Sequence, residues 1–127
     1  MIGKVCAAAA ALVFSAGTAW AAQSCSEPIP PVAVDGLTAT QQQIQDAIAD
    51  FKAFQAASDD FQSCIILKLK EQEKAAAKEK NPKPVDPSVV EAVNAKVQEN
   101  QRLKEKVGGE LNAAILNYKS KSKHPKS

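Results

Sequence analysis

The chain has 127 residues, and its 16 Lys and Arg against 14 Asp and Glu give a formal net charge of only +2. A chain of this length forms at most one small domain once any targeting segment is removed. With a single His and three Cys, it carries few of the residue types on which catalytic and metal sites are built.

Residues 1–21 are predicted to be a secretory signal peptide. Lys4 supplies the positive charge, residues 5–17 are apolar and rich in alanine, and residues 19–21 read Ala-Trp-Ala, an Ala-x-Ala cleavage site. The apolar run is shorter than the roughly 20 residues that a spanning helix needs. A retained N-terminal anchor is the alternative. Cleavage after Ala21 predicts a periplasmic or secreted protein that is not transmembrane.

Residues 22–37 are predicted to be extended because prolines fix the backbone there, including Pro28 and Pro31. After cleavage two cysteines remain, Cys25 and Cys64, and an even number in an exported chain favours one disulfide. The extended segment is long enough to run back along the following helix and bring Cys25 to Cys64. An intermolecular disulfide and two free thiols are the alternatives.

Two long helices are predicted next. Residues 38–80 contain no internal Gly or Pro, have apolar residues at spacings of three and four, and start with a capping box at Thr38 or Thr40. Residues 81–87 contain three prolines and break the helix, and residues 88–119 form the second one. Its predicted cap is either Asp86, with Pro87 in the first position, or Ser88 with Glu91. A short connector implies antiparallel packing. The predicted fold is therefore all-α, a coiled-coil-like two-helix hairpin with an extended, disulfide-tethered N-terminal segment.

The register of the hairpin can be predicted from the position of the bend. With the bend in the middle of residues 81–87, Phe61 faces Val107, and the pair Gly108-Gly109 lies beside Phe61. The apolar seam of the second helix is interrupted by Asn100 and Lys104. Polar residues in such a seam fix the register at a cost in stability.

The first helix is apolar almost all round near Cys64, which makes this region the candidate interaction surface. Its residues are Phe61, Ile65, Ile66, Leu67 and Leu69. One hairpin cannot bury them all, so either the N-terminal segment or another chain covers the rest.

Residues 120–127 are predicted to be a disordered basic tail. Its candidate contacts with anionic envelope surfaces are Lys119, Lys121, Lys123 and Lys126. A solvated tail without such contacts is the commoner outcome.

We expect no catalytic residue, no metal site and no cofactor, and hence no enzyme. His124 lies in the predicted tail without fixed neighbours, although a general base needs positioning. Asp59 and Asp60 are consecutive helix positions that point about 100° apart, so they do not share a site. Cys64 has neither a Cys-x-x-Cys partner nor an adjacent basic cluster to activate it.

The first half of the mature chain resembles a proteobacterial family of small exported helical proteins of uncharacterised function. The matching residues are Cys25, Pro28, Pro30, Asp35, Gly36, Thr38, Ala39, Thr40, Phe61 and Cys64. A weaker resemblance, through the stretch Leu37–Gln41, is to periplasmic chaperones of the Spy and CpxP type, which carry Leu-Thr-x-x-Gln. The first resemblance implies no activity, and the second implies chaperone function.

The expected function is protein–protein interaction or self-association in the cell envelope, without nucleic acid. One alternative is an ATP-independent periplasmic chaperone. Another is an envelope protein that binds anionic surface polymers through its lysines. The chaperone alternative uses the same apolar surface on unfolded clients, whereas the third function uses the lysines.

Overall fold

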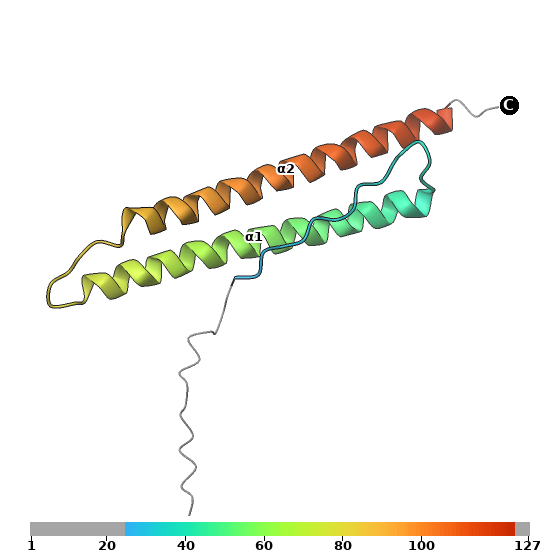
Figure 1. Cartoon of the computed structure of the whole chain (residues 1–127). Helices are drawn as coiled ribbons and strands as arrows, with labels where there is room; N and C mark the ends of the chain where they lie inside the picture. The colour runs from blue at the N-terminus through green and yellow to red at the C-terminus, as the bar shows by residue number, and fades with distance from the viewer. Residues whose placement is uncertain (1–24, 124–127) are drawn as a thin grey trace, which may run out of the picture.

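The computed structural model describes residues 25–123, which form two antiparallel helices and an extended segment (Figure 1). Helix α1 spans Gln41–Ala77 and helix α2 spans Pro87–Lys123. Residues 25–40, here called the strap, run along the hairpin before the chain turns into α1 (Figure 1). There is no strand among these residues. The predicted all-α hairpin is therefore confirmed, while the predicted signal peptide lies outside the described residues.

Helix α1 begins with the predicted capping box, at the second of its two candidate positions. The Gln43 N–H donates to the Thr40 hydroxyl at 3.2 Å, and the Thr40 N–H donates to the Gln43 side-chain oxygen at 2.8 Å. These bonds satisfy two groups that the first turn of a helix would otherwise leave unpaired. At its other end α1 stops at Ala77, so the predicted helix through residue 80 is too long.

Helix α2 begins after Asp86, with Pro87 in the first position, where a backbone N–H is not needed. The Asp86 carboxylate accepts from the Ser88 N–H at 2.9 Å, and the Asp86 carbonyl accepts from the Val89 N–H at 2.9 Å. The bond from the Ser88 backbone, followed by one from its side chain, lowers the pKa of Asp86 below its usual value. Asp86 is thus the cap of α2, as the sequence predicts.

The end of α2 corrects a second prediction. The helix continues through Lys123, so the predicted disorder is wrong for residues 120–123. Residues 124–127, which include His124 and Lys126, lie outside the described part of the chain. The lysines of residues 119–123 therefore project from a regular helix.

The predicted register of the hairpin is wrong by about two helical turns. A Cβ on Gly108 would lie 3.2 Å from the ring of Phe51, so the glycine faces Phe51 and not Phe61. One reason is that α1 ends early, which centres the connection near Pro82. The remaining shift places Asn100 opposite polar partners on α1.

The apolar core is thin and lies in a single line between the helices. At the open end of the hairpin, where Gln41 and Lys123 lie, the strap covers the apolar core. The cluster there consists of Ala39, Ile44 and Ala114, with Val34, Ile48, Ile115 and Tyr118 packed around them. Further along, Phe54, Phe61 and Val107 are buried as well. Two helices alone leave most of their apolar side chains partly exposed, and the strap adds to the burial of these side chains at the open end.

Candidate interaction surface

The strap contacts the hairpin with one residue in three. Cys25, Pro28, Pro31 and Val34 are half-buried, whereas the two residues that follow each of the first three are exposed. This spacing matches the three residues per turn of a polyproline II helix. One edge of the strap therefore packs against the hairpin, and its other two edges face outward.

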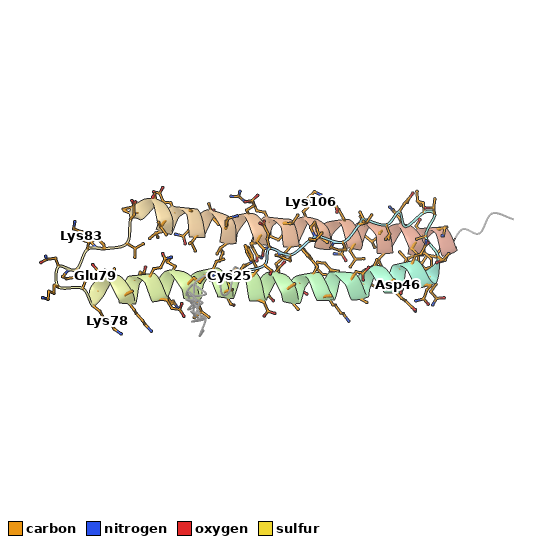
Figure 2. All side chains as sticks on the ribbon, turned by 60° about the horizontal axis from the view of Figure 1, so that its bottom comes forward. Cys25, Asp46, Lys78, Glu79, Lys83 and Lys106 are labelled. Carbon is orange, nitrogen blue, oxygen red and sulfur yellow. A yellow bond between two sulfur atoms is a disulfide. The ribbon has the colours of Figure 1, made fainter. Side chains whose placement is uncertain are left out.

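Bonds and close contacts hold the strap at both of its ends. A disulfide joins Cys25 to Cys64 of α1, with their Cα atoms 5.7 Å apart, which confirms the intramolecular pairing. Cys25 lies midway along α1, so the strap covers only the open half of the hairpin (Figures 1 and 2). At the other end Gly36 is buried against the backbone of Ala114 on α2. The strap is therefore fixed to both helices.

The outward edge of the strap carries two large apolar side chains that nothing in the described chain covers. Ile29 is 88% exposed and Val32 is 91% exposed, and they are three residues apart, one polyproline turn. We call this pair the strap ridge. A cleft between the ridge and α1 is floored by Ala53, Phe54 and Ala57. Exposed apolar residues beside an apolar cleft are typical of interaction sites.

The structure divides the surface that the sequence predicts around Cys64. Phe61 is 5% exposed and belongs to the core, and Ile65 and Leu69 are half-buried. Ile66 and Leu67, at 37% and 58% exposed, remain accessible. The strap begins at Cys25, which is bonded to Cys64, and it does not cover Ile66 or Leu67.

A second apolar groove lies in the loop half of the hairpin, beyond the end of the strap. We call it the loop-half groove. It is lined by Ile65, Val89, Ala92 and Val93, with Ser88 and Lys96 at its edge. Sequence reasoning identified Ile65 but missed the α2 side, because Val89 and Ala92 lie just outside the regular seam. The strap ridge was missed as well, although the three-residue spacing of the strap could have indicated it.

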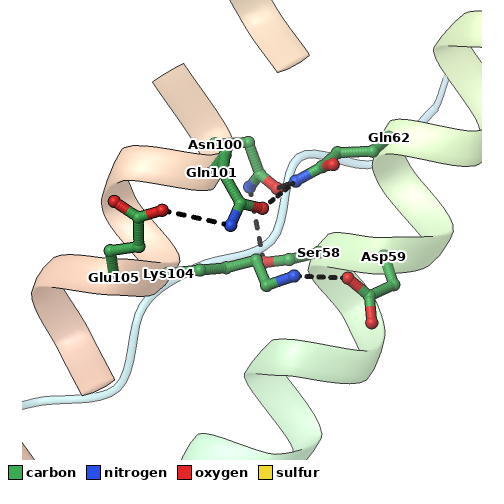
Figure 3. A network of polar contacts seen from close by, with 7 residues as sticks. All are labelled: Ser58, Asp59, Gln62, Asn100, Gln101, Lys104 and Glu105. Carbon is green, nitrogen blue, oxygen red and sulfur yellow. Dashed lines mark hydrogen bonds and ion pairs between the residues drawn. The ribbon is translucent and has the colours of Figure 1, made fainter. Parts of the chain in front are cut away.

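The centre of the helix interface is polar (Figure 3). Asn100, 4% exposed, donates to the hydroxyl of the fully buried Ser58 at 3.4 Å and accepts from the Gln62 amide at 2.7 Å. Lys104 pairs with Asp59 beside them. Asn100 and Lys104, the two polar positions predicted in the seam of α2, thus have partners on α1. No buried side-chain donor or acceptor in residues 25–123 is unpaired.

The lysines of the C-terminal turns do not act as one group. Lys119 and Lys123 are exposed, but the ammonium of Lys121 donates to the carbonyl oxygen of Ala39 at 2.7 Å and lies 5.0 Å from the Tyr118 ring centroid. Lys121 therefore ties α2 to the end of the strap. Of the four lysines predicted to contact anionic surfaces, only Lys119 and Lys123 are exposed on the described helix without such a bond.

Acidic and sulfur side chains do not gather into a chemical site in residues 25–123. Within this range no three His, Cys, Asp or Glu side chains are close enough together to hold a metal ion. Asp59 bonds Lys104, and both cysteines are joined in the disulfide. In the same range neither helix has a stretch long and apolar enough to cross a membrane. What this part of the molecule offers is a set of surfaces.

No protein-family model, curated protein or solved structure matches this chain. The resemblances noted from the sequence therefore stay predictions.

Proposed function

We propose that this is an exported, non-enzymatic protein that acts by binding another protein chain in the cell envelope. A disulfide fits an oxidising compartment, since cytosolic thiols are kept reduced. The predicted signal peptide supports export to the periplasm. We propose that it has no enzymatic role because the sequence contains few residues of the types that form catalytic sites.

The observation that carries this proposal is the exposure of large apolar side chains on a rigid frame. Ile29 and Val32 on the strap and Leu67 on α1 are exposed by more than half. The strap is latched by a disulfide, so its apolar ridge is already held in position. A surface ordered in advance loses less conformational entropy on binding.

The proposal is tested by crosslinking in cells followed by purification of the tagged chain. Ile29→Glu with Val32→Glu places charge on the strap ridge, and Leu67→Glu places charge on α1. We expect at least one of these changes to abolish a specific crosslinked product. Gln98→Glu, at an exposed position of α2, is the matched control and should leave the product unchanged. If neither variant differs from the control, the binding function is wrong.

The chaperone alternative uses the same exposed apolar side chains but predicts a different behaviour. An ATP-independent chaperone suppresses aggregation of a reduced model client, and the charged variants on the ridge lose that effect. A protein with one defined partner does not slow such aggregation. Light scattering of the client with and without the protein separates the two functions.

The anionic-surface alternative depends on the exposed Lys119 and Lys123. Replacing both with Gln should weaken binding to vesicles rich in phosphatidylglycerol, and added salt should weaken it further. Lys70→Gln with Lys78→Gln, at the opposite end of the hairpin, is the matched control. No difference between the two pairs contradicts a role for the C-terminal lysines.

A further inference from the structure

We propose that the partner is a second copy of the same chain, in a symmetric dimer in which the strap ridge of each copy fills the loop-half groove of the other. This inference depends on the proposed binding function and specifies its surface and its partner.

The loop-half groove continues a surface that already binds a strap. Ile65 follows Cys64, where the strap is attached, and Lys96 both lines the groove and pairs with Glu27 of the strap at 3.8 Å. In the open half of the hairpin, the half-buried edge of the strap lines a small cavity together with Phe51, Val107 and Leu111. Val34 of this edge packs against the core cluster. In the loop half the connector lies beside Ala77 and Val90 but does not line the groove, and Val89 is left 36% exposed.

The side chains of the strap ridge are of the same aliphatic type as those that line the groove. Ile29 and Val32 are β-branched aliphatic side chains, as are three of the four residues that line the groove, Ile65, Val89 and Val93. The inner edge of the same strap, with Pro31 and Val34, shows that an extended segment of this composition packs against the two helices. A second copy offers such a segment in the same conformation, already latched.

The spacing of ridge and groove suits a two-fold axis. The ridge lies beside Ala53 and Ala57 on α1, and the groove includes Ile65. At 1.5 Å per residue these levels are separated by about 12–18 Å along α1. A two-fold axis perpendicular to the helices, between these levels, places the ridge of each copy over the groove of the other. The two contacts are then identical, as an isologous dimer requires.

The charges at the two surfaces are complementary. Asp50 lines the cleft at the ridge and is exposed, and Lys96 lies at the edge of the groove with its side chain 56% exposed. In the proposed dimer the carboxylate of Asp50 faces Lys96 of the second copy on both sides of the axis. The interface therefore has an apolar centre and a charged rim.

The proposal is tested on the oxidised mature chain by sedimentation equilibrium over the micromolar range. We expect a monomer–dimer equilibrium. Val32→Glu on the ridge and Ala92→Glu in the groove should each raise the dissociation constant about tenfold or more, because each buries an unpaired charge. Both positions are exposed in the single chain, so the fold should persist, as far-UV circular dichroism checks.

Two further variants make the pairing specific. Val32→Glu combined with Ala92→Lys in one chain should restore dimerisation toward that of the unaltered protein, since the new charges face each other. Leu116→Glu is the matched control, because Leu116 is 66% exposed on α2 away from both surfaces, and it should not change the dissociation constant.

The outcomes separate this inference from the proposed function. A protein that stays monomeric throughout the range, or a dimer that Val32→Glu and Ala92→Glu do not weaken, overturns the ridge-in-groove dimer. If the protein is monomeric but the ridge variants still abolish a crosslink to a different protein, the binding function stands without the dimer. If no crosslink changes either, both are wrong.

Discussion

Gly36 lies against Ala114 so closely that a Cβ on Gly36 would be 1.9 Å from the Ala114 carbonyl oxygen. The same Cβ would lie 2.7 Å from the carbonyl carbon, and these are backbone atoms of a helix that cannot turn aside. Only glycine lets the turn at the end of the strap approach α2 in this way. The Asp35-Gly36 pair therefore forms a turn and also makes a tertiary contact.

Replacing Gly36 with Ala should destabilise the protein by about 1–3 kcal/mol, because the strap must move away from α2. The matched control is Gly109→Ala, whose Cβ would meet nothing within 4 Å and which replaces a glycine in a helix interior. That change should stabilise the protein by about 1 kcal/mol. Urea unfolding followed by circular dichroism measures both. Equal effects of the two changes would show that Gly36 does not make this contact.

Reduction of the Cys25–Cys64 disulfide should lower the free energy of unfolding by about 4 kcal/mol on the chain-entropy model, since the bond closes a loop with a sequence separation of 39. Backbone NMR relaxation should show residues 26–34 becoming mobile on reduction while the helices stay ordered. The variant with both Cys25→Ser and Cys64→Ser should match the reduced protein and be insensitive to reductant. An unchanged melting temperature on reduction contradicts this role.

The polar centre of the interface should show coupling between its members. Asn100→Ala leaves Ser58 and Gln62 without their shared partner and should cost about 1–3 kcal/mol. A double-mutant cycle with Ser58→Ala should give a non-zero interaction energy. Asn112→Ala, at an exposed position of α2, is the control and should have little effect. Strict additivity of the Asn100 and Ser58 changes would rule out the bond between them.

The cap of α2 should make stability depend on pH in the acid range. Hydrogen bonds from Ser88 lower the pKa of Asp86 in the folded protein, so the carboxylate binds its proton less readily there than in the unfolded chain. Its stabilising effect is present above the unfolded pKa and is lost as the pH falls through the folded pKa. A carbon-detected titration of the Asp86 carboxyl should give a pKa below the usual value of an aspartate.

Asp86→Asn is the matched variant for this pH effect, because asparagine also caps a helix but does not titrate. The difference in unfolding free energy between the two proteins should shrink as the pH falls below the unfolded pKa. A constant difference over the acid range would mean that the charge of Asp86 does not contribute.

Much of the fold could be predicted because it depends on local chemistry. The capping box at Thr40, the cap at Asp86 and the prolines between the helices each act over a few residues, and the apolar spacing fixed which faces are buried. The pairing of Cys25 with Cys64 followed from chain length and an even cysteine count. The limits of the helices were less accurate, since α1 ends three residues before residue 80 and α2 continues four residues beyond residue 119.

The surfaces could not be predicted in the same way. Residues around Cys64 appeared equivalent in the sequence, yet Phe61 is buried and Leu67 is exposed, since α2 approaches from one direction only. Val89 and Ala92 became part of a groove through the actual register of the helices. A shift of about two turns exchanges every facing pair while leaving the apolar pattern of each helix unchanged.

The sequence by itself determined two amphipathic helices and the proline connector, and it favoured the disulfide and the helix caps, because each of these depends on spacing along one chain. The tertiary structure decided which residues meet across the hairpin, that Gly36 contacts Ala114, and that Ile29 and Val32 face outward. These depend on how three segments share one thin core, where the polar group of Asn100 must find partners on α1. Polar residues of this kind in a helix seam fix the register.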